Sequence, residues 1–127
     1  MSDPSIEVFA QFVAAINAHD VDRLASLMTR DHVCVESLGN RVQGSETMRN
    51  GWRGYFEMCP DYWIKIRTQL SNGDTILATG LAGGTIDLTP WQTPVALEAV
   101  IQNGLIHEWR VFADNKPVYE ILARRPW

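Results

Sequence analysis

The change of hydrophobic period after residue 60 constrains the fold of this chain more than any other feature. Before that point, apolar residues recur mainly at every third or fourth position, which is the period of an amphipathic helix. From Asp61 onward the period is two, and alternate positions hold Tyr62, Ile64, Ile66, Thr68 and Leu70. A period of two is typical of strands that bury one face. The sequence therefore predicts mainly helices first and a sheet second.

Two Asn-Gly pairs divide the second half into antiparallel strands. Asn72-Gly73 and Asn103-Gly104 each lie between strand-like segments, and Asn-Gly is the strongest short-range indicator of a tight β-hairpin. We predict strands over residues 62–70, 75–87, 94–102 and 105–113. The three glycines between residues 80 and 84 predict a bend or bulge in the second of them.

The first sixty residues are predicted to hold helices and one strand. Asp3 followed by Pro4 is a typical helix start, because the acid can cap free amide groups and proline suits the first turn. Asp20 can cap a second, short helix. The other predicted elements are a strand over residues 32–37 and a helix that opens near residue 45 and stops before Pro60.

An antiparallel meander has one face to cover, and the helices at the front of the chain can cover it. Strands kinked at glycines would curl the sheet into a cone whose open end leaves a cavity for a small ligand. We therefore predict an α+β fold, a cone-shaped, curled antiparallel β-sheet packed on N-terminal helices in the manner of a cystatin-like α+β barrel. Neither a repeat nor a linker divides residues 1–127, which predicts a single domain.

Composition excludes several function classes. The net charge of -4 provides no basic face for nucleic acid, and no apolar stretch approaches the roughly 20 residues that span a membrane. Cys34 and Cys59 lack metal-ligand spacing, as do the three scattered histidines. We expect a cytoplasmic protein without a leader peptide, a metal or another cofactor, and without a nucleic-acid or membrane partner.

Glu36 has the setting that points most directly to chemistry. It closes the run from Asp31 to Gly39, which resembles a strand ending at a glycine turn between apolar helices. An acid at the rim or floor of a hydrophobic cup loses water, so its pKa is predicted to rise toward the range useful for proton transfer. The alternative is a solvated residue at a strand end. His32, two positions earlier on the same strand face, is expected to be exposed.

These elements and local sequences resemble the nuclear-transport-factor-2-like superfamily, which includes ketosteroid isomerases, limonene epoxide hydrolases and polyketide cyclases of the SnoaL type. The resemblance covers nearly the whole chain. It is most specific over residues 12–22 (FVAAINAHDVD) and 31–39, with a weaker similarity over residues 104–112 (GLIHEWRVF). No short signature defines the superfamily, so the resemblance implies the fold more than the chemistry.

The resemblance also implies roles for single residues. Glu36 stands where the isomerases carry their aspartate base, and Glu98 lies near the position of the protonated acid that donates to the oxyanion. Phe12 replaces the tyrosine that makes the second donation, so isomerisation of ketosteroids should be poor. Val111 stands where the epoxide hydrolases carry an acid, which disfavours that activity. Asp114 is the first alternative base, by similarity with the cyclases.

Three functional hypotheses follow. The leading one is proton transfer, an isomerisation, on a small apolar carbonyl compound with Glu36 as general base. The alternatives are a non-catalytic module that binds an apolar metabolite or dimerises, and a cyclase or hydrolase that uses Asp114. Trp63, on the polar side of its strand, predicts a homodimer that pairs through the sheet. The residues expected around the cavity, each with plain core packing as its alternative, are Phe12, Trp52, Phe56, Trp109 and Val111.

Overall fold

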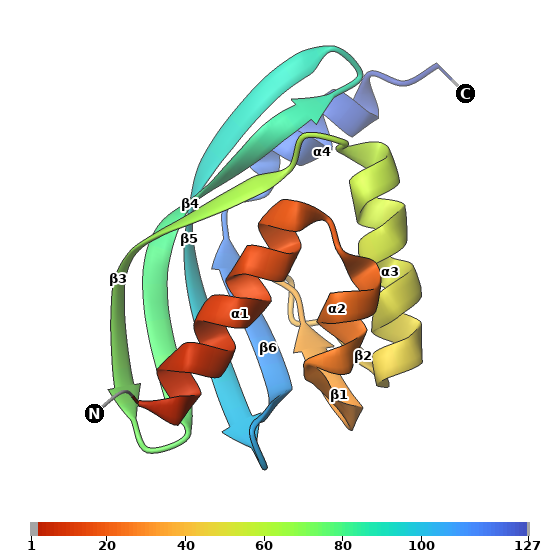
Figure 1. The fold of residues 1–127 in the computed structure, drawn as a ribbon. Coiled ribbons are helices and arrows are strands. Elements are labelled where there is room, and N and C mark those ends of the chain that lie inside the picture. The colour runs from red at the N-terminus through yellow and green to blue at the C-terminus, as the bar shows by residue number, and fades with distance from the viewer. Residues whose placement is uncertain (1–2, 127) are drawn as a thin grey trace.

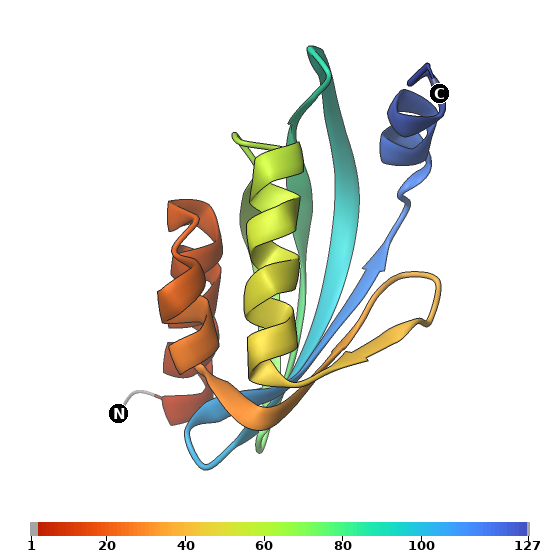
Figure 2. The ribbon, with the colours of Figure 1, turned by 90° about the vertical axis from the view of Figure 1, so that its right-hand side faces the viewer.

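A single curled sheet carries the fold, and helices cover its concave face (Figures 1 and 2). The computed structural model describes residues 3–126. The strands are β1 (Met28–Val35), β2 (Arg41–Gln43), β3 (Trp63–Asn72), β4 (Thr75–Ile86), β5 (Thr89–Gln102) and β6 (Leu105–Ala113). The helices are α1 (Pro4–Ala18), α2 (Val21–Ser26), α3 (Ser45–Met58) and α4 (Lys116–Ala123). The predicted α+β class with N-terminal helices on a curled sheet is confirmed.

Side-chain caps begin the first two helices as the sequence predicted. The Asp3 carboxylate accepts a hydrogen bond from the Ser5 amide at 2.9 Å, and the Asp20 carboxylate accepts one from the Arg23 amide at 2.9 Å. Each cap satisfies an amide group that the first helical turn leaves unpaired. α2 ends at Ser26. Met28, which lies at helical spacing from Leu24, is no longer part of the helix and begins β1.

The second half of the chain is the predicted meander. β3, β4, β5 and β6 pair antiparallel in chain order. Between β5 and β6, Asn103 and Gly104 have φ angles of 53° and 77°, which match the primed turns that fit the twist of a hairpin. Gly73 has a φ angle of 62° in the turn between β3 and β4. Both hairpins are present, but in the first Asn72 pairs with Thr75, so its two turn residues are Gly73 and Asp74 rather than Asn72 and Gly73.

The sheet is mixed rather than wholly antiparallel. Its order is β2-β1-β6-β5-β4-β3, and β1 runs parallel to β6. β2 and β3 form the two edges, so the sheet curls without closing into a barrel. Alternation of apolar residues shows that a segment is a strand but not in which direction its neighbour runs. The sequence also missed β2, which is only three exposed residues long.

β5 begins at Thr89, five residues before the predicted start. Pro90 and Pro94 lie in this part of β5 and cannot donate a backbone hydrogen bond. In the structure β6 pairs with β5 only from Val95 onward, and β4 alone accompanies the earlier part. Proline is tolerated there, because a strand with one partner leaves half of its amide groups unpaired in any case.

The glycines of β4 permit other chain segments to approach closely. The register between β3 and β4 shifts between Ile66 and Thr68, so the bulge lies in β3, opposite the glycine strand. A Cβ atom on Gly80 would overlap the carbonyl oxygen of Lys65, and one on Gly84 would overlap the Cys59 sulfur. The predicted bend is thus produced by close contact of β3 and the α3–β3 connection with β4.

The outer face of the sheet remains open to solvent. Leu77 and Phe112 are exposed by 53% and 53% on this face, and Trp63 is half-buried with its ring over Gly83. Exposed apolar side chains on a sheet suit a second copy of the chain, so the homodimer through the sheet stays a prediction. Within residues 3–126, none of the helices is both long and apolar enough to cross a membrane.

Candidate functional site

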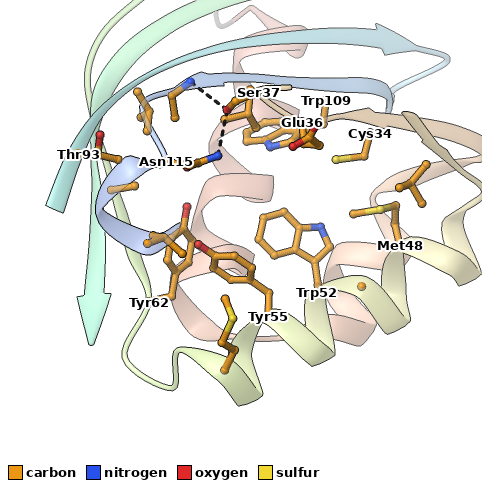
Figure 3. Close-up of a pocket in the computed structure, with 18 of the residues that line it drawn as sticks. Cys34, Glu36, Ser37, Met48, Trp52, Tyr55, Tyr62, Thr93, Trp109 and Asn115 are labelled. Atoms are coloured by element: carbon orange, nitrogen blue, oxygen red, sulfur yellow. Dashed lines mark hydrogen bonds between the residues drawn. The ribbon is translucent and has the colours of Figure 1, made fainter. Parts of the chain in front are cut away.

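A pocket of about 510 Å³ lies between α3, the concave face of the sheet and α4 (Figure 3). Its volume falls within the range of about 300–1,000 Å³ that is usual for small-molecule sites. β1, β5 and β6 supply its inner wall, since their alternate side chains point toward the helices. The pocket therefore lies on the concave side of the curled sheet, and its use as a ligand site stays a prediction.

Aromatic side chains form most of the wall of this pocket. They are Trp52, Tyr55, Tyr62, Trp91, Trp109 and Tyr119. The Tyr55 and Tyr62 rings meet edge to face with their centroids 4.9 Å apart, and Tyr62 stacks on Trp91 at 6.1 Å. Large rigid rings of this kind bind flat apolar molecules at a low cost in side-chain entropy.

Glu36 directly follows β1 and is the one carboxylate among the described residues that line the pocket. Its side chain is half-buried, and its Oε1 atom accepts hydrogen bonds from the amides of Leu38 at 2.9 Å and Asn40 at 2.8 Å. These bonds close the turn in which Gly39 has a φ angle of 89°. The second oxygen, Oε2, makes no hydrogen bond with residues 3–126. One oxygen thus holds the loop while the other is left for a ligand.

Cys34 lies on the same face of β1 as Glu36 and also lines the pocket. Burial, together with the charge of Glu36, raises the pKa of the Cys34 thiol to about 11. The thiol is therefore protonated at neutral pH and is a poor nucleophile. Across the described part of the chain, no group of three or more His, Cys, Asp or Glu side chains could hold a metal ion.

Several hydrogen-bond donors in the pocket wall, those of Tyr55, Tyr62 and Trp52 among them, have no partner within the described residues. Burial raises the pKa of Tyr62 to about 12 and raises that of Tyr55 as well, so both hydroxyls keep their protons. Both tyrosines line the pocket, and their hydroxyls make no hydrogen bond to residues 3–126. The indole Nε1 of Trp52 is buried without a partner. A ligand that carries oxygen acceptors would satisfy these donors.

Neither tyrosine stands out as a donor in the sequence. Tyr55 lies three residues after Trp52, and neighbours three or four apart share a helix face. Tyr62 has the strand parity of Ile64, which is buried on the concave side. Both patterns were present in the sequence, but the turn between α3 and β3, in which the Tyr62 amide donates to the Cys59 carbonyl, brings the two rings together.

Of the five apolar residues predicted around the cavity, Trp52, Trp109 and Val111 line it. Phe12 and Phe56 do not, and for them core packing holds instead. Phe12 is fully buried, with its ring centroid 4.7 Å from that of Trp109. Phe56 stacks on His19 at 4.1 Å, because it lies on the side of α3 that faces the other helices.

Glu98 and Asp114 do not line the pocket, so neither of these acids joins Glu36 there. In β5 the odd-numbered residues face inward, which places Glu98 on the outer face, 3.9 Å from Arg110. Asp114 is exposed, and its Oδ1 accepts from the Lys116 amide at 3.0 Å at the start of α4. Glu98 was thus assigned to the wrong face of its strand. The Asp114 carboxylate instead accepts a backbone hydrogen bond at the start of α4.

His32 is fully buried, in contrast to the exposed position that the sequence predicted. β1 begins at Met28, four residues before the predicted start, so His32 lies inside the strand, between β2 and β6 and beneath α3. The Nδ1 atom of His32 lies 2.9 Å from the carbonyl oxygen of Ile106 and donates to it, while Nε2 is buried without a partner. Burial is the largest cause that lowers the pKa of His32 below its ordinary value of 6.5.

The stability of the protein should therefore fall as the pH drops below about 6.5. In this range the unfolded chain binds a proton at His32 that the folded chain excludes, so the free energy of unfolding decreases by up to about 1.4 kcal/mol per pH unit. The nearby charges act in both directions, since His107 lowers the pKa while Asp31 and Glu108 raise it. Above about pH 6.5 this contribution is constant.

The variant His32→Asn tests this pH dependence, because the Asn amide can still donate to Ile106. Urea denaturation at steps between pH 7.5 and 5.5 should show a steeper loss of stability for the parent protein than for the variant. Equal slopes would show that His32 does not cause the dependence.

Comparison with known proteins identifies the family and the fold of the chain. The model of the SnoaL-like domain family matches residues 9–116. No curated protein matches the chain. Among solved structures, a SnoaL-like polyketide cyclase, so described provisionally, from Jannaschia sp. CCS1 has a TM-score of 0.83 at 18% identity, over 97% of this chain and 94% of its own.

Two further structures share the fold. An LEH-like epoxide hydrolase from M. tuberculosis has a TM-score of 0.82 at 20% identity, over 95% of this chain and 90% of its own. An uncharacterised cystatin-fold protein from Novosphingobium aromaticivorans has a TM-score of 0.78 at 23% identity, over 87% of this chain and 98% of its own. At these identities the likeness concerns the fold alone.

Proposed function

The chain belongs to the SnoaL-like domain family, and from this premise we propose that its pocket binds a neutral, apolar carbonyl compound and transfers a proton on it. Glu36 is the general base in this proposal. The observation that carries it is the position of Glu36, the one carboxylate among the described lining residues, with one oxygen left for a ligand.

The wall of the pocket supports a ligand without charge. Aromatic rings dominate it, and no Lys, Arg or His belongs to the described residues that line it. An anionic ligand would find no cation there, and its desolvation would be uncompensated. The free donors of Trp52, Tyr55 and Tyr62 instead suit the oxygen atoms of a ketone or an enol.

In the proposed reaction Glu36 removes a proton from the carbon next to the carbonyl group. The electrons of the broken C–H bond form a C=C bond, and the carbonyl oxygen becomes an enolate. The hydroxyls of Tyr55 and Tyr62 stabilise this oxygen by donating hydrogen bonds in a site with little water. In a β,γ-unsaturated ketone this enolate is a conjugated dienolate, so Glu36 can return the proton to the γ-carbon. The C=C bond then moves into conjugation with the carbonyl group, which completes an isomerisation. Tyr55 and Tyr62 thus supply the hydrogen bonds to the enolate oxygen that Phe12, which has no hydroxyl, cannot supply.

A second candidate, a non-catalytic binding module, is favoured by one observation. The Glu36 carboxylate already stabilises the loop through its Oε1 atom, which is a complete structural role for a residue at a strand end. In that case the pocket would bind the same neutral molecules but would leave their protons in place.

Exchange of α-protons separates the two functions without knowledge of the natural substrate. We expect the protein to bind 2-tetralone, an apolar bicyclic ketone, and to quench the fluorescence of the tryptophans that line the pocket. In D₂O the protein should also accelerate the replacement of the α-protons of 2-tetralone by deuterium, followed by proton NMR. Binding without acceleration would favour the binding module, and no binding would contradict both functions.

A further inference from the structure

A second cavity of about 440 Å³, here called the outer cavity, adjoins the pocket. Ser37, Ala113, Asn115 and Tyr119 line both spaces, so they share one wall. The outer cavity lies between the loop after β1 and α4, on the solvent side of this wall. A ligand that extends through this wall would therefore have the volume of both cavities available to it.

The wall between the two cavities contains one weakly held side chain. Ser37 Oγ accepts a hydrogen bond from the Ala113 amide at 3.1 Å and another from Asn115 Nδ2 at 3.4 Å (Figure 3). A hydrogen bond of 3.4 Å is at the long end of the usual range and is correspondingly weak. Asn115 can therefore turn away at little cost, which would join the pocket to the outer cavity.

The walls of the outer cavity suit an aliphatic chain. Leu38 is 70% exposed on one side, and Ala123 faces it from α4. Three charged residues of the described part of the chain line the cavity. The charged ends of Lys116 and Glu120 lie 3.7 Å apart and so offset each other, and the Asp114 carboxylate accepts a hydrogen bond from the Lys116 amide at 3.0 Å. An ionic group would find no unmatched charge in this pair, whereas an alkyl chain would cover the exposed leucine.

We propose that the ligand is elongated, with a carbonyl-bearing ring in the pocket and an alkyl side chain that passes Asn115 into the outer cavity between Leu38 and Ala123. This inference rests on the proposed function of the pocket and names its substrate class. The ligand is an apolar aryl or cyclic ketone with an aliphatic chain of several carbons, whose end reaches solvent beside Lys116.

A homologous series of phenyl n-alkyl ketones tests the inference. Affinities for acetophenone, butyrophenone and hexanophenone are measured by quenching of Trp52, Trp91 and Trp109, which line the pocket. Each methylene that leaves water should raise the affinity by about 3- to 4-fold. Hexanophenone, with four more methylenes than acetophenone, should bind on the order of 100-fold more tightly.

Two variants place the chain in the outer cavity. Leu38→Asn removes its apolar wall, and Ala123→Trp fills it; neither residue lines the pocket. Both variants should bind acetophenone like the parent protein, while the gain from acetophenone to hexanophenone should shrink to below about 10-fold. Leu88→Asn is the matched control, because Leu88 is 97% exposed at the β4–β5 turn and lines neither cavity. This control variant should keep the full rise in affinity, on the order of 100-fold, from acetophenone to hexanophenone.

The outcomes are distinct. If acetophenone binds but the affinity does not rise with chain length, or rises equally in all variants, the outer cavity does not hold the chain. The inference is then overturned while the proposed function stands. If no ketone of the series binds to the parent protein, the pocket does not accept such compounds, and the proposed function and the inference fall together.

Discussion

Glu36→Gln is expected to slow the α-proton exchange of 2-tetralone by about 100- to 10,000-fold, the usual contribution of a general base. Glutamine has the same shape as glutamate, and its side-chain oxygen can still accept from the amides of Leu38 and Asn40. The loop should therefore keep its conformation. What is lost is the basic oxygen, so the affinity for 2-tetralone should stay within about threefold of the parent value. Proton NMR measures the exchange, and tryptophan fluorescence measures the affinity.

Glu98→Gln is the matched control for this variant. It makes the same chemical change on the outer face of the sheet, beside Arg110 and away from the pocket. Exchange should be unaffected in the control. Equal exchange in Glu36→Gln and the parent protein would show that Glu36 is not the base. An equal loss of affinity and exchange would indicate a role in the structure of the loop alone.

Gly80→Ala should lower the free energy of unfolding by about 3 kcal/mol or more, the upper part of the range for overpacked sites. A Cβ atom there would overlap the carbonyl oxygen of Lys65 and would lie 3.1 Å from the Cα of Ile66. Both are backbone atoms of β3, so no side chain can rotate aside and the strand itself must shift. Chemical denaturation measures the loss.

Gly54→Ala provides the control for the loss of a glycine. Gly54 lies on the exposed side of α3, and a Cβ atom there meets no other atom within 4 Å. Alanine should stabilise the helix by about 0.5–1 kcal/mol. If the free energy of unfolding of Gly80→Ala is instead within about 1 kcal/mol of the parent value, the close approach of β3 to β4 does not depend on this glycine.

Features that depend on short-range chemistry were predictable from the sequence. Asp3 and Asp20 cap helices because a carboxylate two or three residues from a free amide can always reach it. Asn103-Gly104 turns the chain because these residues tolerate positive φ angles. Glu36 was placed at a cavity by the same kind of argument, since a strand followed by a glycine turn ends at the rim of a sheet.

Features that depend on long-range packing were not predictable with the same certainty. Glu98 was assigned to the pocket, yet a difference of one residue in strand parity turns a side chain to the opposite face. His32 was expected to be exposed as the first residue of the predicted strand, but it is buried beneath α3 and beside β6. Tyr55 and Tyr62 meet through the turn that joins α3 to β3, but the pocket that they line also needs β5, β6 and α4, which come much later in the chain.

The residue pattern by itself determined most of the helices and strands, the presence of the two hairpins after Asn72 and Gln102, and which acid follows the first strand. Only the tertiary structure decided which face each strand presents to the pocket, that β1 runs beside β6 in parallel, and that unpaired donors lie in the same cavity as Glu36. The physical reason is range. Caps, turns and periodicity act over a few residues, whereas register and burial depend on contacts between segments that are distant in the chain.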